Sequence, residues 1–508
     1  MRSHVAELSS QKPLSLWLLR LAATLLVLGL GYTISLSPSW LHLGFRLTDP
    51  THLIGLLGML AVALAILKWP EAGLLGLLAV IYTNASEVGV RFHELPSLLQ
   101  AFLPVLLIAL TVRWLIRRGG RVSFDSVMVW LVAYAALLFA SSARARSVPL
   151  ADASLLEYLK SLVILFLIVN LVTSRLALRR AVWVLVLAGA FLGTISVYQV
   201  ATSSYDTTFW GFGRIKLAQI VGSLYEPRIA GPLGDPNFYA QILLIVVPLA
   251  LYRLWDESSV RLKMLAAYAL GVITVALVFT YSRGGALALG LVLVLALLDR
   301  KAQIRSALLG LLVIVPLLVL APQQFEGRLG TLKQLLPGQH ESVIHADTSI
   351  QERTLLMRCA WQMFLDHPIL GVGADNYGEY YDEYAERVGS AVSSYEDFGR
   401  RRFPHSLYLQ IAAETGLVGL VVFAVILALT LRRLRAARRL FRAANDERSR
   451  GLVTSLLLGF LGYLTTSLIL HGDYVRCFWL LVALAIAASK IAEHAAAQAQ
   501  AARSLRAI

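Results

Sequence analysis

A His-Ser pair stands where a long polar stretch of the sequence gives way to an apolar segment. Pro404-His405-Ser406 is followed, nine residues after the serine, by Gly416-x-x-Gly419. This position puts one imidazole at an expected boundary between membrane and water. Histidine is the side chain best suited to take a proton near neutral pH, so His405 is a candidate general base. The alternative for a lone histidine at a helix start is a capping or interfacial role.

Two arginines lie at similar boundaries. Arg228 precedes the apolar segment that begins at Pro236, and Arg283 lies in a turn between two apolar segments. A charge at that depth is costly without a partner, which makes both arginines functional candidates. A diphosphate is a natural partner, because guanidinium groups bind phosphate oxygens in a fork. The alternative is that each arginine anchors a helix end at the lipid headgroups.

Glycines accompany both arginines. Gly231, Gly234, Gly284 and Gly285 would let backbone N–H groups approach an anion closely, and the helix expected after Pro236 would add a favourable amino terminus. Together with His405, the two Arg/Gly segments predict a diphosphate site.

Other chemistries lack support in the sequence. His, Cys, Asp and Glu do not cluster at the usual spacing of metal ligands, and no Gly-rich loop precedes a Lys-Ser/Thr pair. We therefore expect no metal, no cofactor and no ATP hydrolysis. His471, beside Asp473 in a tight turn, is a weaker catalytic candidate than His405.

The composition predicts an all-α polytopic membrane protein. The chain has 508 residues, of which 57% are hydrophobic and 15% charged, and a span needs about 20 apolar residues. Hydropathy and charge together predict 14 spans, or 12 if one short pair is re-entrant. Their approximate positions are 15–35, 52–67, 69–83, 96–115, 125–142, 154–173, 180–200, 236–255, 262–281, 284–299, 304–322, 405–431, 452–471 and 474–491.

The net charge of +15 is distributed in a way that indicates orientation. Basic residues gather in alternate loops and most densely at 432–442, the pattern of the positive-inside rule, which argues against nucleic-acid binding. An even number of spans places both termini in the cytoplasm. We interpret the first apolar segment as a retained signal anchor, and Cys359 and Cys477 as packing residues.

The segment 323–404 is the one large extramembrane region and is expected to be partly helical. Ser349-x-x-Glu352 predicts a helix that runs to about Asp366, and a second, Tyr-rich helical piece is expected over 376–387. Its tyrosines form either a sugar-stacking surface or ordinary packing: Tyr377, Tyr380, Tyr381 and Tyr384. The expected division is amino-terminal spans 1–200, central spans 201–322, loop 323–404, carboxy-terminal spans 405–492 and tail 493–508.

In this order, the motifs resemble the O-antigen ligase and polymerase superfamily over about residues 190–430. The resemblance rests on these elements: Arg228 with its Gly-Pro-x-x-Asp-Pro-Asn continuation; Ser282-Arg283-Gly284; Arg353, Trp361 and His367-Pro368-x-x-Gly371-x-Gly373; His405-Ser406; and Gly416 with Gly419.

The resemblance implies an inverting, metal-independent glycosyltransferase of the membrane-embedded type-C kind in the bacterial inner membrane. Its donor would be a glycan on undecaprenyl diphosphate at the periplasmic face. His405 would be the base, Arg228 and Arg283 would hold the diphosphate with weaker support for Arg353, and the acceptor would lie near Trp361 and the tyrosines. The spacing after His405 favours a ligase that uses lipid A–core over a polymerase that extends a growing glycan. A flippase or transporter is the alternative from another class, but it should show charged or broken helices near mid-membrane, often in repeated halves.

Overall fold

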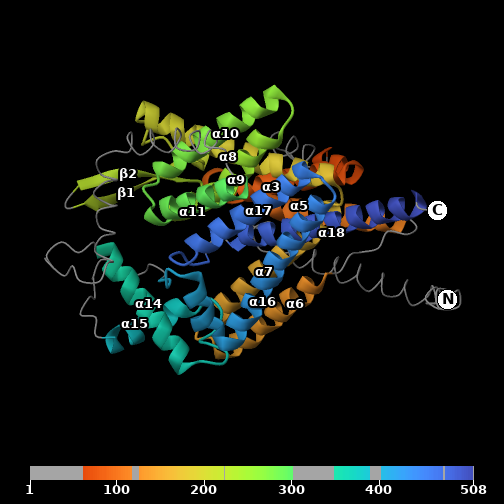
Figure 1. The fold of residues 1–508 in the computed structure, drawn as a ribbon. Coiled ribbons are helices and arrows are strands. Elements are labelled where there is room, and N and C mark those ends of the chain that lie inside the picture. Colours follow the sequence, from red (N-terminus) through yellow and green to blue (C-terminus); the bar gives the residue numbers. More distant parts are fainter. Residues whose placement is uncertain are drawn as a thin grey trace, which may run out of the picture.

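The computed structural model describes residues 61–116, 125–221, 224–300, 348–388, 402–472 and 475–506. This part is helical apart from one antiparallel hairpin of β1 (Arg214–Val221) and β2 (Leu224–Gly231) (Figure 1). Before the hairpin come α3 (Pro70–Tyr82), α4 (Ala85–His93), α5 (Leu98–Ile116), α6 (Ser126–Ser141), α7 (Val148–Leu171) and α8 (Arg175–Thr202), with short 3₁₀ turns η3 (Ser142–Arg144) and η4 (Phe209–Gly211). After it come α9 (Pro236–Asp256), α10 (Val260–Val278), α11 (Arg283–Asp299), α14 (Thr348–Asp366), α15 (Tyr377–Arg387), α16 (Leu407–Ala443), α17 (Glu447–Thr466) and α18 (Val475–Arg506).

The structure agrees with a polytopic membrane protein but does not confirm 14 or 12 spans. In the described residues, 7 helices are long and apolar enough to cross a membrane, or 8 if α3 and α4 count as one span bent by 62°. The predicted span 284–299 corresponds to α11, which has 17 residues. The predicted spans 15–35 and 304–322, and most of 52–67, lie outside the described residues.

Helix α9 lies at the centre of the bundle. Of its most apolar 18-residue window, 83% is buried inside the protein, as expected for a helix that is apolar on every side. It packs against α10 and α17. Its one buried amide, Gln241, donates to the hydroxyls of Thr466 at 2.9 Å and Ser467 at 3.1 Å, which joins α9 to the end of α17.

The predicted span that starts at His405 is broken at Gly416. This glycine has φ +66° and ψ −164° inside α16, and a Cβ there would lie 2.3 Å from the carbonyl carbon of Ile369. The backbone groups released by the kink find partners in the passage after α14. Val372 and Gly373 donate to the carbonyls of Ala413 and Glu414 at 2.9 and 3.0 Å; Leu417 and Val418 donate to Pro368 and Ile369 at 2.7 and 3.4 Å. The Gly416 motif and the His367–Gly373 motif are thus two sides of one joint.

This joint fixes α14 and α15 on the bundle. The predicted helices are confirmed, since α14 ends at Asp366 and α15 covers Tyr377–Arg387. Asn376 exchanges two hydrogen bonds with the backbone of Ser147 at 2.8 and 3.2 Å, and Arg146 donates to Glu383 at 2.5 Å. Helix α14 is therefore held over the first turns of α16, where His405 lies.

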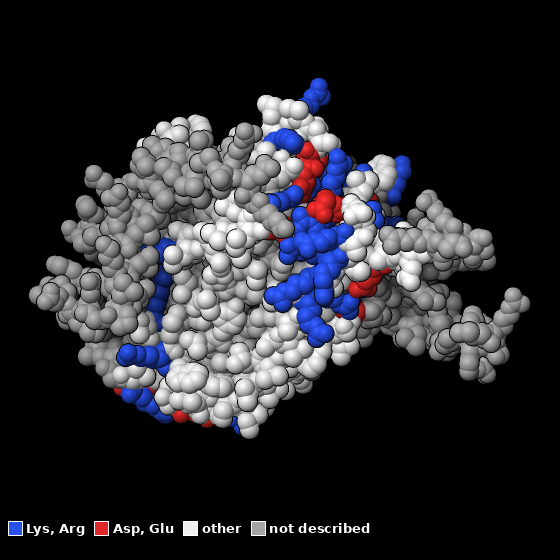
Figure 2. All heavy atoms as spheres, in the orientation of Figure 1, with Lys and Arg blue, Asp and Glu red and all other residues white. Residues whose placement is uncertain are grey.

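The hairpin was not predicted. It lies with α14 and α15 at one end of the molecule, and the end of α18 lies at the other (Figure 1). Helix α16 links the two regions, and its 27 residues after the break at Gly416 span about 40 Å. Its last turns carry Arg435, Arg438, Arg439 and Arg442, and Figure 2 shows Lys and Arg gathered densely in that region. Basic charge and His405 therefore lie at opposite ends of α16.

Candidate functional site

His405 lies in a strained backbone position that the neighbouring turn holds in place. Its φ is +47°, in the left-handed region, which costs a non-glycine residue of the order of 1–3 kcal/mol. Ser406 then caps α16 by accepting from the N–H of Leu409. The N–H of Leu407 donates to the carbonyls of Ser467 at 3.0 Å and Leu470 at 2.8 Å. The turn after α17 thus holds the backbone directly after His405 in place.

Aromatic rings surround the imidazole. His471 lies edge-on to His405 with ring centroids 5.3 Å apart. His471 is itself stacked on Phe403 at 4.2 Å and meets Phe238 edge-on at 4.9 Å. The Nδ1 atom of His405 is buried, and none of the described residues provides it with a hydrogen-bond partner. A buried ring nitrogen of this kind suits a ligand that brings its own donor.

The surroundings keep His405 neutral. Burial, then the positive charge of Arg353 and the proximity of His471, together lower the pKa of His405 to about 3, although Asp235 acts to raise it. A neutral imidazole is the form that accepts a proton, but a pKa this low makes the free imidazole a weak base, so a role as general base requires bound substrate to raise the pKa. Arg353 lies on α14, which packs against α16, the helix that follows His405.

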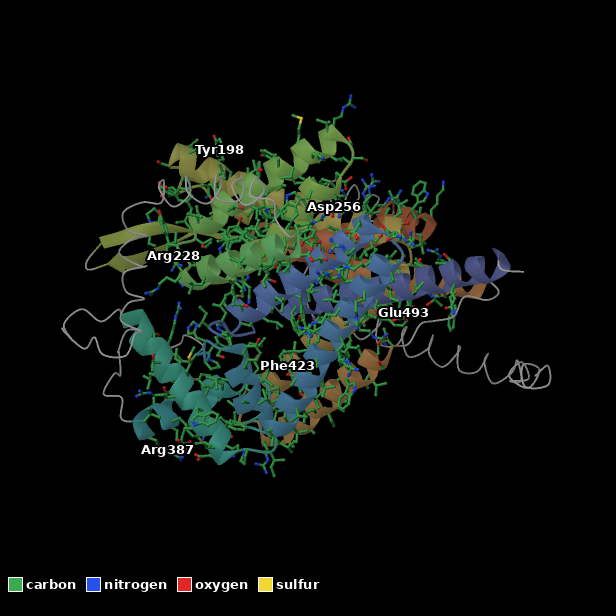
Figure 3. All side chains as sticks on the ribbon, viewed as in Figure 1. Tyr198, Arg228, Asp256, Arg387, Phe423 and Glu493 are labelled. Carbon is green, nitrogen blue, oxygen red and sulfur yellow. The ribbon has the colours of Figure 1, made fainter. Side chains whose placement is uncertain are left out.

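Arg228 is buried at the base of the hairpin, with a relative exposure of 6%. Its Nε donates to the carbonyl of Thr280 at 2.9 Å, and one terminal nitrogen donates to Asn237 at 3.3 Å. Figure 3 shows Arg228 at the hairpin end of the molecule, with Asp256 near the other end of α9. Because Thr280 begins the turn that leads to Arg283, the two predicted Arg/Gly segments lie side by side.

Arg283 is the first residue of α11, whose amino terminus is capped by the hydroxyl of Ser282. The next residue, Gly284, lies against Ile469, since a Cβ on it would be 2.2 Å from that side chain. Ile469 belongs to the turn that holds His405 and His471. Arg228, Arg283, Arg353 and His405 therefore lie on segments that contact one another.

All four glycines of the two Arg/Gly segments pack closely against neighbouring residues. A Cβ on Gly231 would meet the ring of Tyr239 at 2.5 Å, and a Cβ on Gly234 would meet the guanidinium of Arg214 at 2.3 Å. The N–H of Gly234 donates to Ala230, and that of Gly285 donates to Ser282. The prediction that their N–H groups hold an anion is therefore wrong for Gly234 and Gly285.

The amino terminus of α9 is also occupied. The carboxylate of Asp235 accepts from the N–H groups of Asn237 at 2.8 Å and Phe238 at 3.3 Å and pairs with Lys216 at 3.2 Å. Burial would raise the pKa of Asp235, but Lys216 and these N–H groups hold it below its usual value. The predicted use of this terminus for a diphosphate is wrong, because Asp235 is already the anion there. Lys216 was missed with the hairpin; the alternation Arg214-Ile215-Lys216-Leu217 was the available signal.

The predicted sugar-stacking residues differ in exposure. Tyr377 is fully buried, Tyr381 is 7% exposed, and the hydroxyl of Tyr377 donates to Leu356 at 2.8 Å. Both rings belong to the small core between α14 and α15, which agrees with the packing alternative. Tyr380 lies under Arg146, with the guanidinium carbon 3.8 Å from the ring centroid, and Trp361 is 50% exposed. Of the predicted sugar-stacking residues, Trp361 is therefore the one with a freely exposed ring, since Arg146 covers a face of Tyr380.

The cysteine interpretation is confirmed, since both Cys359 and Cys477 are buried and free. Within the described ranges, no group of three or more His, Cys, Asp or Glu side chains lies close enough together to hold a metal ion.

Comparison with known proteins identifies a family model that matches part of the chain. Residues 266–424 match the family model described as O-antigen ligase. The matched region includes Arg283, Arg353 and His405, whereas Arg228 precedes it. No curated protein matches the chain. The match supports the resemblance drawn from the motifs for residues 266–424, which resemble the domain of the O-antigen ligase and polymerase superfamily.

Proposed function

We propose that the protein is a glycosyltransferase that moves a glycan from undecaprenyl diphosphate to an acceptor hydroxyl at the periplasmic face of the inner membrane. The observation that carries this proposal is the buried Nδ1 of His405, which has no hydrogen-bond partner among the described residues and lies beside segments that bear three arginines. The His-Ser-x9-Gly-x-x-Gly spacing supports the ligase type, with lipid A–core as acceptor. The polymerase type, with a growing glycan as acceptor, is the second candidate within the same family.

The proposed reaction is a single displacement. His405 takes the proton of the acceptor hydroxyl as its oxygen forms a bond to the anomeric carbon of the donor. The bond from that carbon to the diphosphate oxygen breaks, and the electron pair leaves with undecaprenyl diphosphate. Attack from the face opposite the leaving group inverts the anomeric configuration.

The arginines would stabilise the leaving group. Arg228 and Arg283 lie on adjacent segments, and Arg353 lies on α14, which packs against α16. Preorganised positive charge in a site that excludes water stabilises a developing diphosphate strongly. We propose that these guanidinium groups supply the charge that a metal ion supplies in other transferases.

The proposed orientation follows from the distribution of charge. The arginine-rich end of α16 favours the cytoplasm by the positive-inside rule, and the opposite end carries His405. We therefore place both termini in the cytoplasm and the site at the periplasmic side. A donor whose lipid chain stays in the outer leaflet could then present its diphosphate to the arginines.

The pH dependence is expected to differ between the free enzyme and the donor complex. Free His405 has a pKa of about 3, so kcat/KM should stay level from pH 8 to below pH 5. Bound diphosphate adds negative charge beside Arg353 and raises the pKa of His405, so the acid limb of kcat should lie at higher pH. Arg353→Gln should move the acid limb of kcat/KM to higher pH, because it removes a positive charge that lowers the pKa of His405. If the acid limbs of the kcat and kcat/KM profiles coincide near pH 6.5, His405 is an ordinary exposed histidine.

Arg283→Lys should lower kcat/KM about 100-fold although the charge is kept, because lysine cannot bind phosphate in a fork. Turnover with defined lipid-linked donor measures this. Arg261→Lys, near the start of α10, is the matched control and should leave turnover unchanged. Wild-type turnover in Arg283→Lys would refute a forked phosphate contact.

Purified protein in liposomes with undecaprenyl-diphosphate oligosaccharide tests the proposed function. Product that requires added lipid A–core indicates a ligase, and a ladder of longer glycans without added acceptor indicates a polymerase. If the wild-type protein forms no product with either acceptor, the proposal is contradicted.

A further inference from the structure

A chamber of about 570 Å³ lies beside the His405 site, between α7 and the first turns of α16. One wall carries Phe403, Leu407 and Gln410, which continue directly from the segment that holds His405. One stripe of α7, which includes Glu157 and Tyr158, also lines the chamber. Ligand pockets typically measure about 300–1,000 Å³, so the chamber has room for sugar rings.

Aromatic rings form the deep part of the chamber. Tyr158 lies edge-on to Tyr134 at 5.3 Å and to Trp479 at 5.1 Å, and Phe423 lies 6.3 Å from Tyr134. All four side chains line the chamber. Aromatic surface combined with a few polar groups suits a ring with one apolar face and hydroxyls at its edge.

One polar group in this wall has no partner. Trp479 is 2% exposed, and its Nε1–H finds no acceptor among the residues that the structure describes. A buried donor left unsatisfied costs about 1–3 kcal/mol, so such groups normally meet a ligand or water. Glu157, which accepts from Lys160 at 2.7 Å and pairs with Arg476, adds a carboxylate that can bind hydroxyls.

The charges of the chamber differ from those around His405. Among the lining residues, the acidic side chains Glu87, Glu157, Asp375 and Glu414 offset the basic side chains Arg91, Arg214 and Arg476. By contrast, Arg228, Arg283 and Arg353 make the neighbouring region positive. A diphosphate therefore favours the arginines, and an uncharged hydroxyl-rich group favours the chamber.

We propose that the chamber holds the terminal sugar of the acceptor glycan, with Trp479 and Glu157 as specificity-determining residues. This assignment rests on the proposed glycan transfer. A sugar seated there would lie along the first turns of α16, with one hydroxyl directed toward His405. The donor diphosphate would approach from the hairpin side.

Binding without turnover tests the proposal. The probes are core oligosaccharide freed of lipid A and the repeat-unit oligosaccharide freed of its lipid diphosphate, each titrated by calorimetry onto His405→Asn protein in nanodiscs. We expect one of them to bind, and Trp479→Phe and Glu157→Gln each to weaken that binding about tenfold. Trp255→Phe, on α9 outside the chamber, is the matched control and should not change it.

Turnover then assigns the sugar to the acceptor. In protein that keeps His405, Trp479→Phe and Glu157→Gln should each raise the KM for acceptor about tenfold and leave the KM for donor unchanged. The assignment would be overturned if neither probe binds, or if both variants bind the probe as tightly as the protein with an intact chamber. A rise in the KM for donor alone would also overturn it. Transfer that fails while chamber-dependent binding persists would instead contradict the proposed function.

Discussion

Replacement of His405 is expected to lower glycan transfer by about 10²–10⁴-fold, the usual contribution of a general base. The backbone there has φ +47°, so His405→Ala would combine loss of the base with strain. Asparagine and glycine tolerate this conformation, and His405→Asn and His405→Gly therefore test the base alone. Single-turnover transfer with saturating donor and acceptor measures the loss.

A matched histidine and chemical rescue complete this experiment. His367, after the end of α14, is half-buried and lies outside the His405 site, so His367→Asn should transfer at the wild-type rate. Imidazole added to His405→Gly should restore part of the activity, because the cavity left by the ring can admit it. Full activity of His405→Asn would remove His405 from the mechanism.

Arg228→Lys should have the next largest effect, a loss of at least about 100-fold in kcat/KM. The guanidinium is buried and already binds Thr280 and Asn237, so it is oriented before substrate arrives. Lysine lacks the forked donors of a guanidinium group. It therefore cannot bind the turn before Arg283 and a phosphate at the same time. The loss should appear in kcat as well as in the KM for donor.

Stability must be measured beside activity for this variant. Loss of the Arg228 contact to Thr280 should cost about 1–3 kcal/mol, because it leaves a buried carbonyl unpaired. Arg113→Lys, near the end of α5, is the control and should change neither the unfolding transition nor turnover. If Arg228→Lys loses stability but keeps kcat/KM, the arginine only anchors the hairpin.

Much of the helical architecture could be predicted because it depends on local signals. The Ser349–Glu352 pattern and Pro368 predicted α14, and the described spans follow the hydropathy. The kink at Gly416 could not be predicted, because its backbone groups are satisfied by residues 368–373, about 45 positions earlier in the chain. Short-range pattern cannot reveal hydrogen bonds between distant segments.

The candidate site residues could be proposed from the sequence, but the backbone that surrounds them could not. Arginines and a histidine at membrane boundaries stand out in a sequence as functional candidates, because burying such side chains is costly. Whether a glycine exposes its N–H or makes room for a ring depends on the neighbour: Gly231 faces Tyr239, and Gly284 faces Ile469. Asp235, isolated in sequence, proved to cap α9 and to pair with Lys216 from the hairpin.

The central claim is that His405 drives the transfer of a glycan off a diphosphate, and one measurement tests it most directly. Donor labelled in both glycan and lipid is mixed with the His405 or His405→Asn protein and acceptor, and both products are followed in a single turnover. We predict that undecaprenyl diphosphate and glycosylated acceptor form in equal amounts at equal rates, and only with His405. Intact donor that merely changes leaflet would contradict the account in favour of a flippase; equal release by His405→Asn would contradict the role of His405.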